Sequence, residues 1–102
     1  MESFFDKVFA TVKEIPWGKV ATYGQIAMVV GHPGASRAVG STLRKNPNPG
    51  MYPCHRVVNS KGALAAGFAF GGTDMQKKLL EDEGVSVSSA GTVDLRKYSH
   101  KF

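Results

Sequence analysis

Apolar residues recur at helical spacing near the N-terminus and predict an amphipathic helix over residues 3–15. Ser3 can cap the start of this helix, and Pro16 ends it. The residues that share the apolar face are Phe4, Phe5, Val8, Phe9, Val12 and Ile15. We interpret this face as core. The following sequence WGKVAT, residues 17–22, predicts a turn and a short extended piece.

A second helix is predicted to start at Thr22, because Gln25 follows three residues later in the pattern of a capping box. Its apolar face consists of Tyr23, Ile26, Ala27 and Val30. The sequence GHPG at 31–34 stops the helix, since glycine and proline interrupt regular structure.

A third helix is predicted from about Ala35 to Arg44, and its middle consists of small residues. Gly40 costs about 1 kcal/mol of helix propensity relative to alanine, which indicates a close neighbour. Two short helices joined by a four-residue turn over about 22–44 are typical of a helix-turn-helix. Helical hairpins of this shape also occur as plain structure.

The next stretch alternates between loops and one short strand. KNPNPG at 45–50 predicts a loop, and HRVVNSKGAL at 55–64 predicts a strand with Val57 and Val58 inside, followed by a turn. AAGFAFGG at 65–72 is apolar but interrupted by glycines, so we predict a mobile loop there.

The last helix is predicted to start at Thr73, with Gln76 again in the fourth position of a capping box, and to end at Gly84. The residues expected to face inward are Met75, Leu79 and Leu80. The tail over 85–102 predicts one strand and a frayed end. Together these elements predict one domain over residues 1–102, mostly α-helical with short strands (α+β).

Acidic residues are absent from a long central part of the chain. Residues 15–73 contain no Asp or Glu but six cations, within a chain of net charge +5. The six are Lys19, Arg37, Arg44, Lys45, Arg56 and Lys61. A positive field of this kind attracts polyanions, so the charge favours nucleic acid as the partner over a basic face that only aids solubility. No apolar run reaches the roughly 20 residues needed to span a bilayer, and the composition predicts a cytoplasmic domain without a membrane partner.

The single cysteine, Cys54, lies directly beside His55. On a regular strand the two side chains would point to opposite faces, so they can act together only through an irregular backbone or a bridging water. Pro53 favours such a bend. A metal site is not predicted, because one cysteine with scattered histidines is a poor ligand set for zinc. A nucleophile and an inert buried cysteine both remain open from this pair alone.

Three carboxylates in LLEDEG, residues 79–84, lie in the last turn of a predicted helix, where the helix dipole disfavours negative charge. Glu81 and Asp82 are interpreted as solvated. Glu83 precedes the terminating Gly84 and could turn inward to orient a histidine, as the third member of a nucleophile–base–orienter relay.

Several spaced segments resemble the DNA-binding, active-site domain of the O6-alkylguanine-DNA alkyltransferases. The segments are VATYGQIA at 20–27, SRAVGSTLRKNPNPGMYPCHRVVNSKG at 36–62 and LLEDEG at 79–84. The likeness runs from about residue 2 to 84 and implies the winged-helix-like helix-turn-helix fold of the alkyltransferase C-terminal domain.

The resemblance implies catalytic roles by position within the active-site motif, residues 53–57, and around it. Cys54 resembles the alkyl acceptor, His55 its water-bridged base, and Glu83 the group that orients the imidazole. Tyr23 resembles the tyrosine that rotates the 3′ phosphate and protonates the leaving guanine. Asn46 resembles the asparagine that ties the active-site turn to the helix-turn-helix.

The resemblance also implies a DNA interface without a cofactor. Arg37 resembles the arginine finger that fills the gap left by the flipped nucleotide, and Arg44 a backbone contact. The recognition helix of the family enters the minor groove, which would explain the small residues of the third helix. The DNA-binding set is Thr22, Tyr23, Arg37, Ala38, Gly40, Ser41 and Arg44, and the set expected around the lesion is Tyr23, Cys54, Val57, Ala69, Phe70 and Gly71.

Two departures separate the chain from the family's enzymes. The matching region begins almost at Met1, whereas the enzymes carry a further N-terminal domain. That form resembles the alkyltransferase-like proteins, which bind the lesion without repairing it and pass it to nucleotide excision repair, although those usually lack cysteine at the position of Cys54. The loop GFAFGG at 67–72 is also two residues longer, counted from Cys54, and more apolar.

We therefore expect a monomeric lesion sensor that binds duplex DNA, flips O6-alkylguanine and marks it for nucleotide excision repair, close to the nucleoid if the source is bacterial. The first alternative is a single-turnover methyltransferase that uses Cys54. The second is a helix-turn-helix regulator in which Cys54 is inert.

Overall fold

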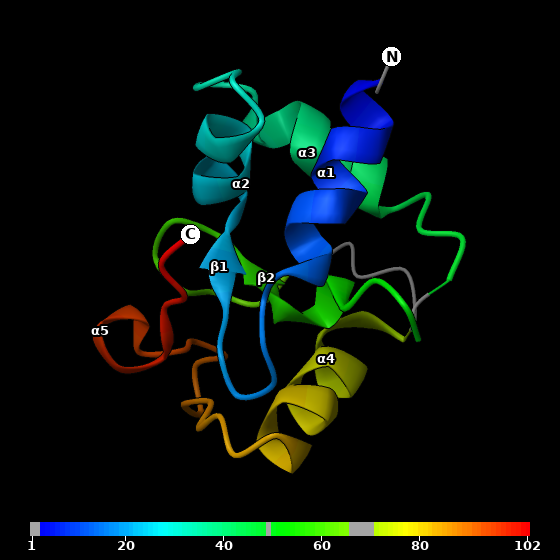
Figure 1. The fold of residues 1–102 in the computed structure, drawn as a ribbon. Helices are drawn as coiled ribbons and strands as arrows, with labels where there is room; N and C mark the ends of the chain where they lie inside the picture. The colour runs from blue at the N-terminus through cyan, green and yellow to red at the C-terminus, as the bar shows by residue number, and fades with distance from the viewer. Residues whose placement is uncertain (1–2, 49, 66–70) are drawn as a thin grey trace.

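Helices surround a two-stranded parallel sheet in the computed structural model, which describes residues 3–48, 50–65 and 71–102 (Figure 1). The helices are α1 (Phe4–Lys13), α2 (Tyr23–Val29), α3 (Ser36–Leu43), a 3₁₀ helix (Cys54–Arg56), α4 (Gly72–Asp82) and α5 (Leu95–Tyr98). The strands are β1 (Ala21–Thr22) and β2 (Val57–Val58). The α+β fold predicted from the sequence is confirmed.

Reciprocal capping boxes start the first two α-helices. The sequence predicted the Ser3 cap of α1 and the full box at Thr22 and Gln25, but not the part of Asp6 in the first box. The Ser3 hydroxyl accepts from the Asp6 backbone N–H at 3.1 Å, and the Asp6 carboxylate accepts from the Ser3 N–H. Thr22 and Gln25 repeat the arrangement, at 3.1 and 2.8 Å. Each box satisfies two backbone donors that the helix leaves free at its N-terminus.

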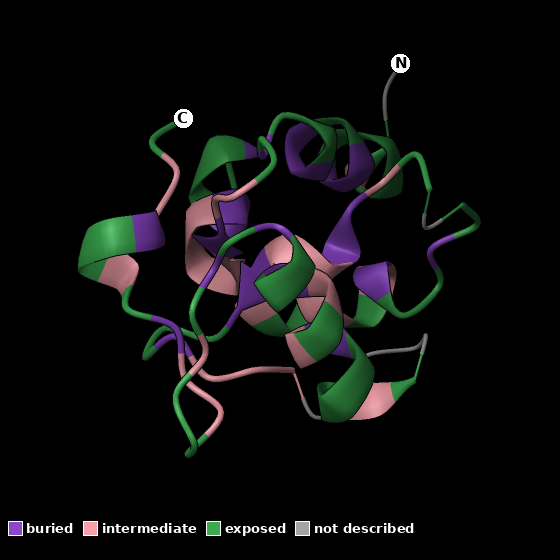
Figure 2. Ribbon diagram, turned by 90° about the horizontal axis from the view of Figure 1, so that it is seen from below, coloured by how far each residue is buried: buried purple, intermediate pink, exposed green. Residues whose placement is uncertain are grey.

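The main core lies where α1, α2 and α3 pack against one another. Figure 2 shows the buried segments gathered in the interior, with exposed residues on the outer turns of the helices. Fully buried side chains at this junction include Val8, Val12, Ile26 and Val39. Phe5 was predicted to share this core, but it is 38% exposed and packs its ring against Phe9 at 4.6 Å between centroids.

The parallel sheet joins the helix-turn-helix to the segment that contains the cysteine. Ala21 pairs with Val57, and Thr22 pairs with Val58. β1 continues directly into α2, and β2 directly follows the 3₁₀ helix. The sheet therefore fixes the start of α2 and the 3₁₀ helix to one scaffold.

The predicted capping box at the start of α4 is wrong. Gly71 is the N-cap, in a left-handed conformation with φ of +119°, and the helix begins at Gly72 rather than after Thr73. A Cβ on Gly71 would lie 2.7 Å from the Cβ of Met75, so a glycine is required at this turn. Met75 is 40% exposed, contrary to the prediction that it faces inward, whereas Leu80 is fully buried.

The tail is more ordered than the predicted single strand and frayed end, and α4 is not the last helix. Asp94 caps α5, and backbone bridges join Ala63 to Thr92, Val87 to Val93 and Val20 to Ser99. These contacts build a second core, which consists of Val20, Val58, Leu80, Val85, Val93 and Tyr98. Local periodicity could not reveal this core because its members come from four separate parts of the chain.

Candidate functional site

Cys54 begins the 3₁₀ helix, so the backbone at the cysteine is irregular. Pro53 is the N-cap, the Cys54 N–H donates to the Tyr52 carbonyl at 2.7 Å, and the Arg56 N–H donates to the Pro53 carbonyl at 2.9 Å. Because this tight turn precedes β2, Cys54 and His55 do not lie on a regular strand that would point their side chains to opposite faces. Cys54 itself is only 8% exposed.

Glu83 turns inward from the C-terminal end of α4 and pairs with His55, the contact that the sequence predicted. Its Oε2 lies 2.6 Å from His55 Nε2. Burial opposes ionisation of this carboxyl, but hydrogen bonds from Arg56, from the Gly18 N–H at 3.0 Å and from His55 outweigh it and lower the pKa of Glu83. Glu83 is therefore a carboxylate at neutral pH.

Arg56 is a site residue that the sequence reasoning missed. Its Nε donates to Glu83 Oε1 at 2.9 Å, its Nη2 to Glu83 Oε2 at 3.0 Å, and its Nη1 to the Ile15 carbonyl at 2.7 Å. Its guanidinium also lies 5.7 Å from the centre of the Trp17 ring. The bidentate geometry fixes the carboxylate that orients His55, so Arg56 is a positioning residue. The feature of the sequence that could have indicated this role is the position of Arg56 directly after Cys54 and His55.

The protonation states follow from burial and from this network. Burial raises the pKa of the Cys54 thiol, although a hydrogen bond with Asn46 acts in the opposite direction. Burial also lowers the pKa of His55, more than Glu83 raises it. At neutral pH the protein thus holds a thiol beside a neutral imidazole. Since Glu83 can only accept, His55 Nε2 carries the proton and Nδ1 is left as the basic nitrogen.

Asn46 connects the end of α3 to the segment before the cysteine. Its side-chain amide donates to the Tyr52 carbonyl at 2.9 Å, and its Oδ1 accepts from the Asn48 N–H at 2.9 Å. The side chain is buried. This geometry makes the position of Cys54 depend on the position of the helix-turn-helix.

Tyr23, the first residue of α2, lies close to α3 and to the cysteine. Burial raises the pKa of its phenol; the charge of Arg44 lowers it and the thiolate form of Cys54 would raise it. The phenol is therefore within electrostatic range of both groups. Its ring also borders Gly40, where an added Cβ would lie 3.8 Å from Tyr23 Cε1.

The outer face of α3 presents the predicted DNA-binding side chains to solvent. Arg37, Ala38, Ser41 and Arg44 are at least partly exposed, while Val39 and Leu43 are buried. The close neighbour predicted for Gly40 is not found among the described residues, because 3.8 Å is an ordinary contact distance. The small surface of α3 therefore faces outward.

Gln76 is a second residue whose place the sequence did not reveal. It is fully buried, and its amide donates to the His55 carbonyl at 3.1 Å and to the Val57 carbonyl at 3.0 Å. Its Oε1 accepts from the Ala65 N–H at 2.7 Å. One side chain thus ties the cysteine segment to α4 and to the start of the 65–72 loop.

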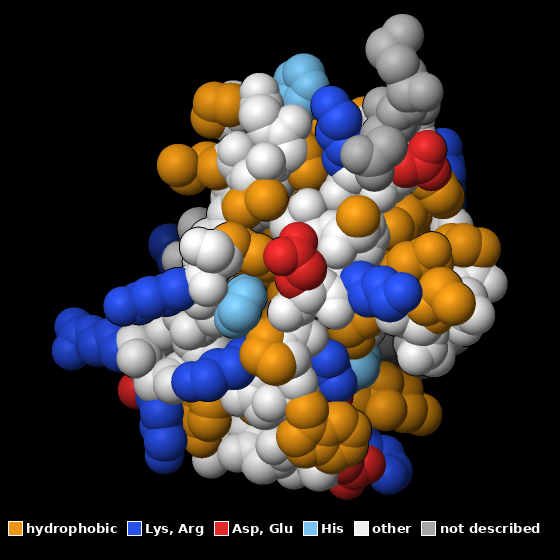
Figure 3. All heavy atoms as spheres, in the orientation of Figure 1, with side chains coloured by type: hydrophobic (Ala, Val, Ile, Leu, Met, Phe, Trp, Pro, Cys, Tyr) orange, Lys and Arg blue, Asp and Glu red, His pale blue; other side chains and the backbone are white. Residues whose placement is uncertain are grey.

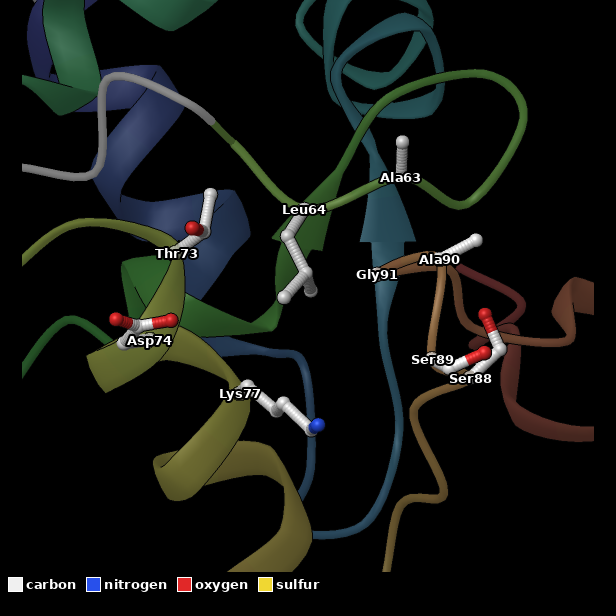
Figure 4. A pocket seen from close by; sticks show the side chains of 9 residues that line it. All are labelled: Ala63, Leu64, Thr73, Asp74, Lys77, Ser88, Ser89, Ala90 and Gly91. Carbon is white, nitrogen blue, oxygen red and sulfur yellow. The ribbon is translucent and has the colours of Figure 1, made fainter.

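The residues predicted around the lesion are only partly described. Ala69 and Phe70 lie outside the described residues, Gly71 is exposed at the start of α4, and Val57 is fully buried in the core. A separate hollow of about 340 Å³ lies between α4 and the turn at 88–91, with Lys77 of α4 and Ser88 of the turn in its lining (Figure 4). None of the predicted site residues lines that hollow.

Neither a metal centre nor a membrane span emerges from the described parts of the chain. No group of three or more His, Cys, Asp or Glu side chains among these residues is arranged to hold a metal ion. Among them, too, no helix has the length and apolar character to cross a bilayer.

Comparison with known sequences identifies relatives along nearly the whole chain. Residues 3–85 match the family model of the 6-O-methylguanine DNA methyltransferase, DNA binding domain. A "DNA base-flipping protein" of Vibrio parahaemolyticus is 43% identical over 98 residues, 96% of either chain. A "methylated-DNA–protein-cysteine methyltransferase" of Methanosarcina acetivorans is 46% identical over 81 residues, which cover 79% of this chain but 51% of that protein.

Comparison with solved structures gives the same family. The crystal structure of Schizosaccharomyces pombe Atl1 in complex with damaged DNA containing O6-carboxymethylguanine superposes with a TM-score of 0.84 at 40% identity. The match covers 100% of both chains.

Proposed function

Because the chain belongs to the 6-O-methylguanine DNA methyltransferase family through its DNA-binding domain, we propose that it is an alkylation-lesion sensor. It binds duplex DNA, flips O6-alkylguanine out of the stack and holds it beside Cys54. The bound lesion is then passed to nucleotide excision repair proteins.

One observation carries this proposal: the match along both full chains to a protein crystallised on DNA that contains O6-carboxymethylguanine. The relative called a DNA base-flipping protein adds support, since it too is matched over almost its whole length. A base altered at O6 cannot be contacted on that atom inside a stacked duplex, so recognition requires extrusion of the nucleotide.

The geometry supports different roles for the exposed face of α3 and for the residues that connect it to the cysteine. The exposed face of α3, with Arg37 and Ala38, would enter the groove, and Arg37 would occupy the gap in the stack. Tyr23 would turn the backbone beside the lesion, because it lies at the junction of α2, α3 and Cys54. Asn46 would transmit the position of α3 to the 3₁₀ helix.

The protonation states favour binding over alkyl transfer. A thiol is a poor nucleophile, and burial holds the pKa of Cys54 above its ordinary value. The pKa of His55 is lowered too, so the resting imidazole is neutral and the thiol keeps its proton until His55 accepts it. A buried neutral thiol would instead act as a small apolar group against which the alkyl group of the lesion packs.

The second candidate is a single-turnover methyltransferase, favoured by the presence of Cys54 beside the His55–Glu83 pair. In that reaction the thiol loses its proton to His55 Nδ1, directly or through a water. The Cys54 sulfur bonds to the methyl carbon as the bond from carbon to guanine O6 breaks, and the guanine takes up a proton.

Intact-protein mass spectrometry after incubation with an O6-methylguanine duplex separates these two functions. For the sensor we expect tight binding and an unchanged mass. A gain of one methyl group that disappears in Cys54→Ala would establish the methyltransferase instead.

The regulator alternative is tested by affinity for one duplex with and without the lesion. We expect the wild type to prefer the O6-methylguanine duplex, and Arg37→Ala to abolish most of that preference because the gap in the stack stays unfilled. Lys61→Ala removes an exposed cation outside α3 and is the control. Equal affinities of the wild type for both duplexes would contradict lesion recognition, and an equal effect of both variants would contradict the role of Arg37.

A further inference from the structure

The segment after Val85 lies beyond the residues that match the family model, yet it is fixed beside the start of α2. The Val20 N–H donates to the Tyr98 carbonyl at 2.9 Å, and the His100 N–H donates to the Val20 carbonyl at 2.7 Å. The pairing of Val20 with Ser99 is parallel, so the C-terminal end runs in the same direction as β1.

His100 therefore lies beside the strand that leads into α2, whose N-cap is Thr22. The side chain of Gln25 confirms how close the two segments lie, because its amide donates to the His100 carbonyl at 3.0 Å. The C-terminal end therefore adjoins the N-terminal part of α2, which in the proposed function contacts the DNA backbone beside the lesion.

Positive charge is concentrated on this flank. The cations are Lys19, Arg96, Lys97 and Lys101, and we call these four residues the tail cluster. Figure 3 shows Lys and Arg side chains gathered on the side where Figure 1 places α5 and the C-terminus. The one acid of the tail, Asp94, uses its carboxylate to cap α5.

The charges of the tail cluster are not neutralised within the described chain. None of its Lys or Arg side chains forms an ion pair with a described residue. Lys19 Nζ instead lies 3.5 Å from the Lys97 carbonyl, which holds two cationic side chains on one surface. Unpaired cations beside a proposed DNA interface favour contact with a polyanion.

We propose that the tail cluster is a second DNA-binding surface, which contacts duplex phosphates next to the α2–α3 interface. The proposal rests on the proposed function only for the location of the duplex. Because phosphate contacts carry no base information, the cluster should raise affinity for damaged and undamaged DNA equally.

The salt dependence of binding tests this proposal with the full chain. Removal of one lysine–phosphate interaction should reduce the slope of log K against log salt by about 0.9. For Lys97→Ala/Lys101→Ala we expect a slope smaller by roughly 1.8 and weaker binding by one common factor for the lesion duplex and the undamaged duplex. Lys7→Ala/Lys13→Ala is the matched control, since it removes the same charge from two exposed positions of α1 that form no ion pair with a described residue.

A slope for the tail variant that equals the wild-type or the control slope would overturn the proposal. So would weaker binding confined to the lesion duplex, which would place the tail at the lesion rather than on the backbone. Lys101→Glu, a change of one exposed residue beyond α5, provides a second variant and should weaken binding more than Lys101→Ala. If the wild type fails to prefer the lesion, lesion sensing fails, but the slopes on undamaged DNA still decide this proposal.

Discussion

Gly40 lowers the stability of α3 through its poor helix propensity, although the space around it would accept a larger side chain. It lies inside α3, where glycine is less favourable than alanine by about 1 kcal/mol. A Cβ at this position would meet only the Tyr23 ring, at an ordinary contact distance of 3.8 Å. Nothing among the described residues therefore requires glycine there. We expect the reason for glycine to lie in the approach of α3 to DNA.

Gly40→Ala should raise the free energy of unfolding by up to about 1 kcal/mol and weaken binding to duplex DNA at the same time. The gain in stability follows from helix propensity, and the weaker binding follows because a methyl group thickens the helix where it approaches the groove. Chemical denaturation and a binding titration measure the two effects on one variant. An increase in both stability and affinity would show that this face of α3 does not contact the duplex.

At the scale of the elements, Glu83 connects α4 to the 3₁₀ helix through its contacts with His55 and Arg56. These contacts make the free energy of unfolding depend on pH. The pKa of Glu83 is lowered on folding, so its stabilisation is complete above the pKa of the unfolded chain and is lost as pH falls through the folded pKa. The pKa of His55 is also lowered, so the unfolded chain takes up a proton first, below about pH 6.5. Both groups weaken the fold on acidification.

Glu83→Gln should therefore cost about 3 kcal/mol at pH 7, because it leaves Arg56 without its carboxylate. The difference from the wild type should shrink as pH is lowered towards the pKa of Glu83, since protonation removes the same charge. Urea denaturation between pH 7 and pH 2.5 measures this, because the difference should stay constant above about pH 4.5 and shrink only below it. Asp82→Asn on the same turn is the control, and a constant difference across the range would contradict the assignment.

Elements controlled by neighbouring residues were predictable from the sequence, and those controlled by distant contacts were not. The Ser3 cap and the box at Thr22 are local, and both were predicted. Thr73 presents the same local pattern, but Gly71 starts α4 and the partners of Gln76 lie in the cysteine segment and at Ala65. In the site, a charge misplaced at a helix end predicted that Glu83 turns inward to a histidine, and the family resemblance identified that histidine as His55. Arg56 and Gln76 were missed because their partners lie 11 or more residues away.

At the scale of the whole molecule, the tail completes a second core and also presents the tail cluster, so its fold and its charge must be tested separately. Tyr98 is 8% exposed in that core, whereas Phe102 is 43% exposed. Tyr98→Ala should lower the free energy of unfolding by about 3 kcal/mol, and Phe102→Ala should change it little. Denaturation curves for both aromatic variants measure how much the tail stabilises the second core. The same measurement on Lys97→Ala/Lys101→Ala shows whether removal of the two charges changes the stability of the fold. Equal, small changes for the two aromatic residues would show that the tail adds nothing to the core, and an unstable lysine variant would mean that its charges act through the fold rather than on DNA.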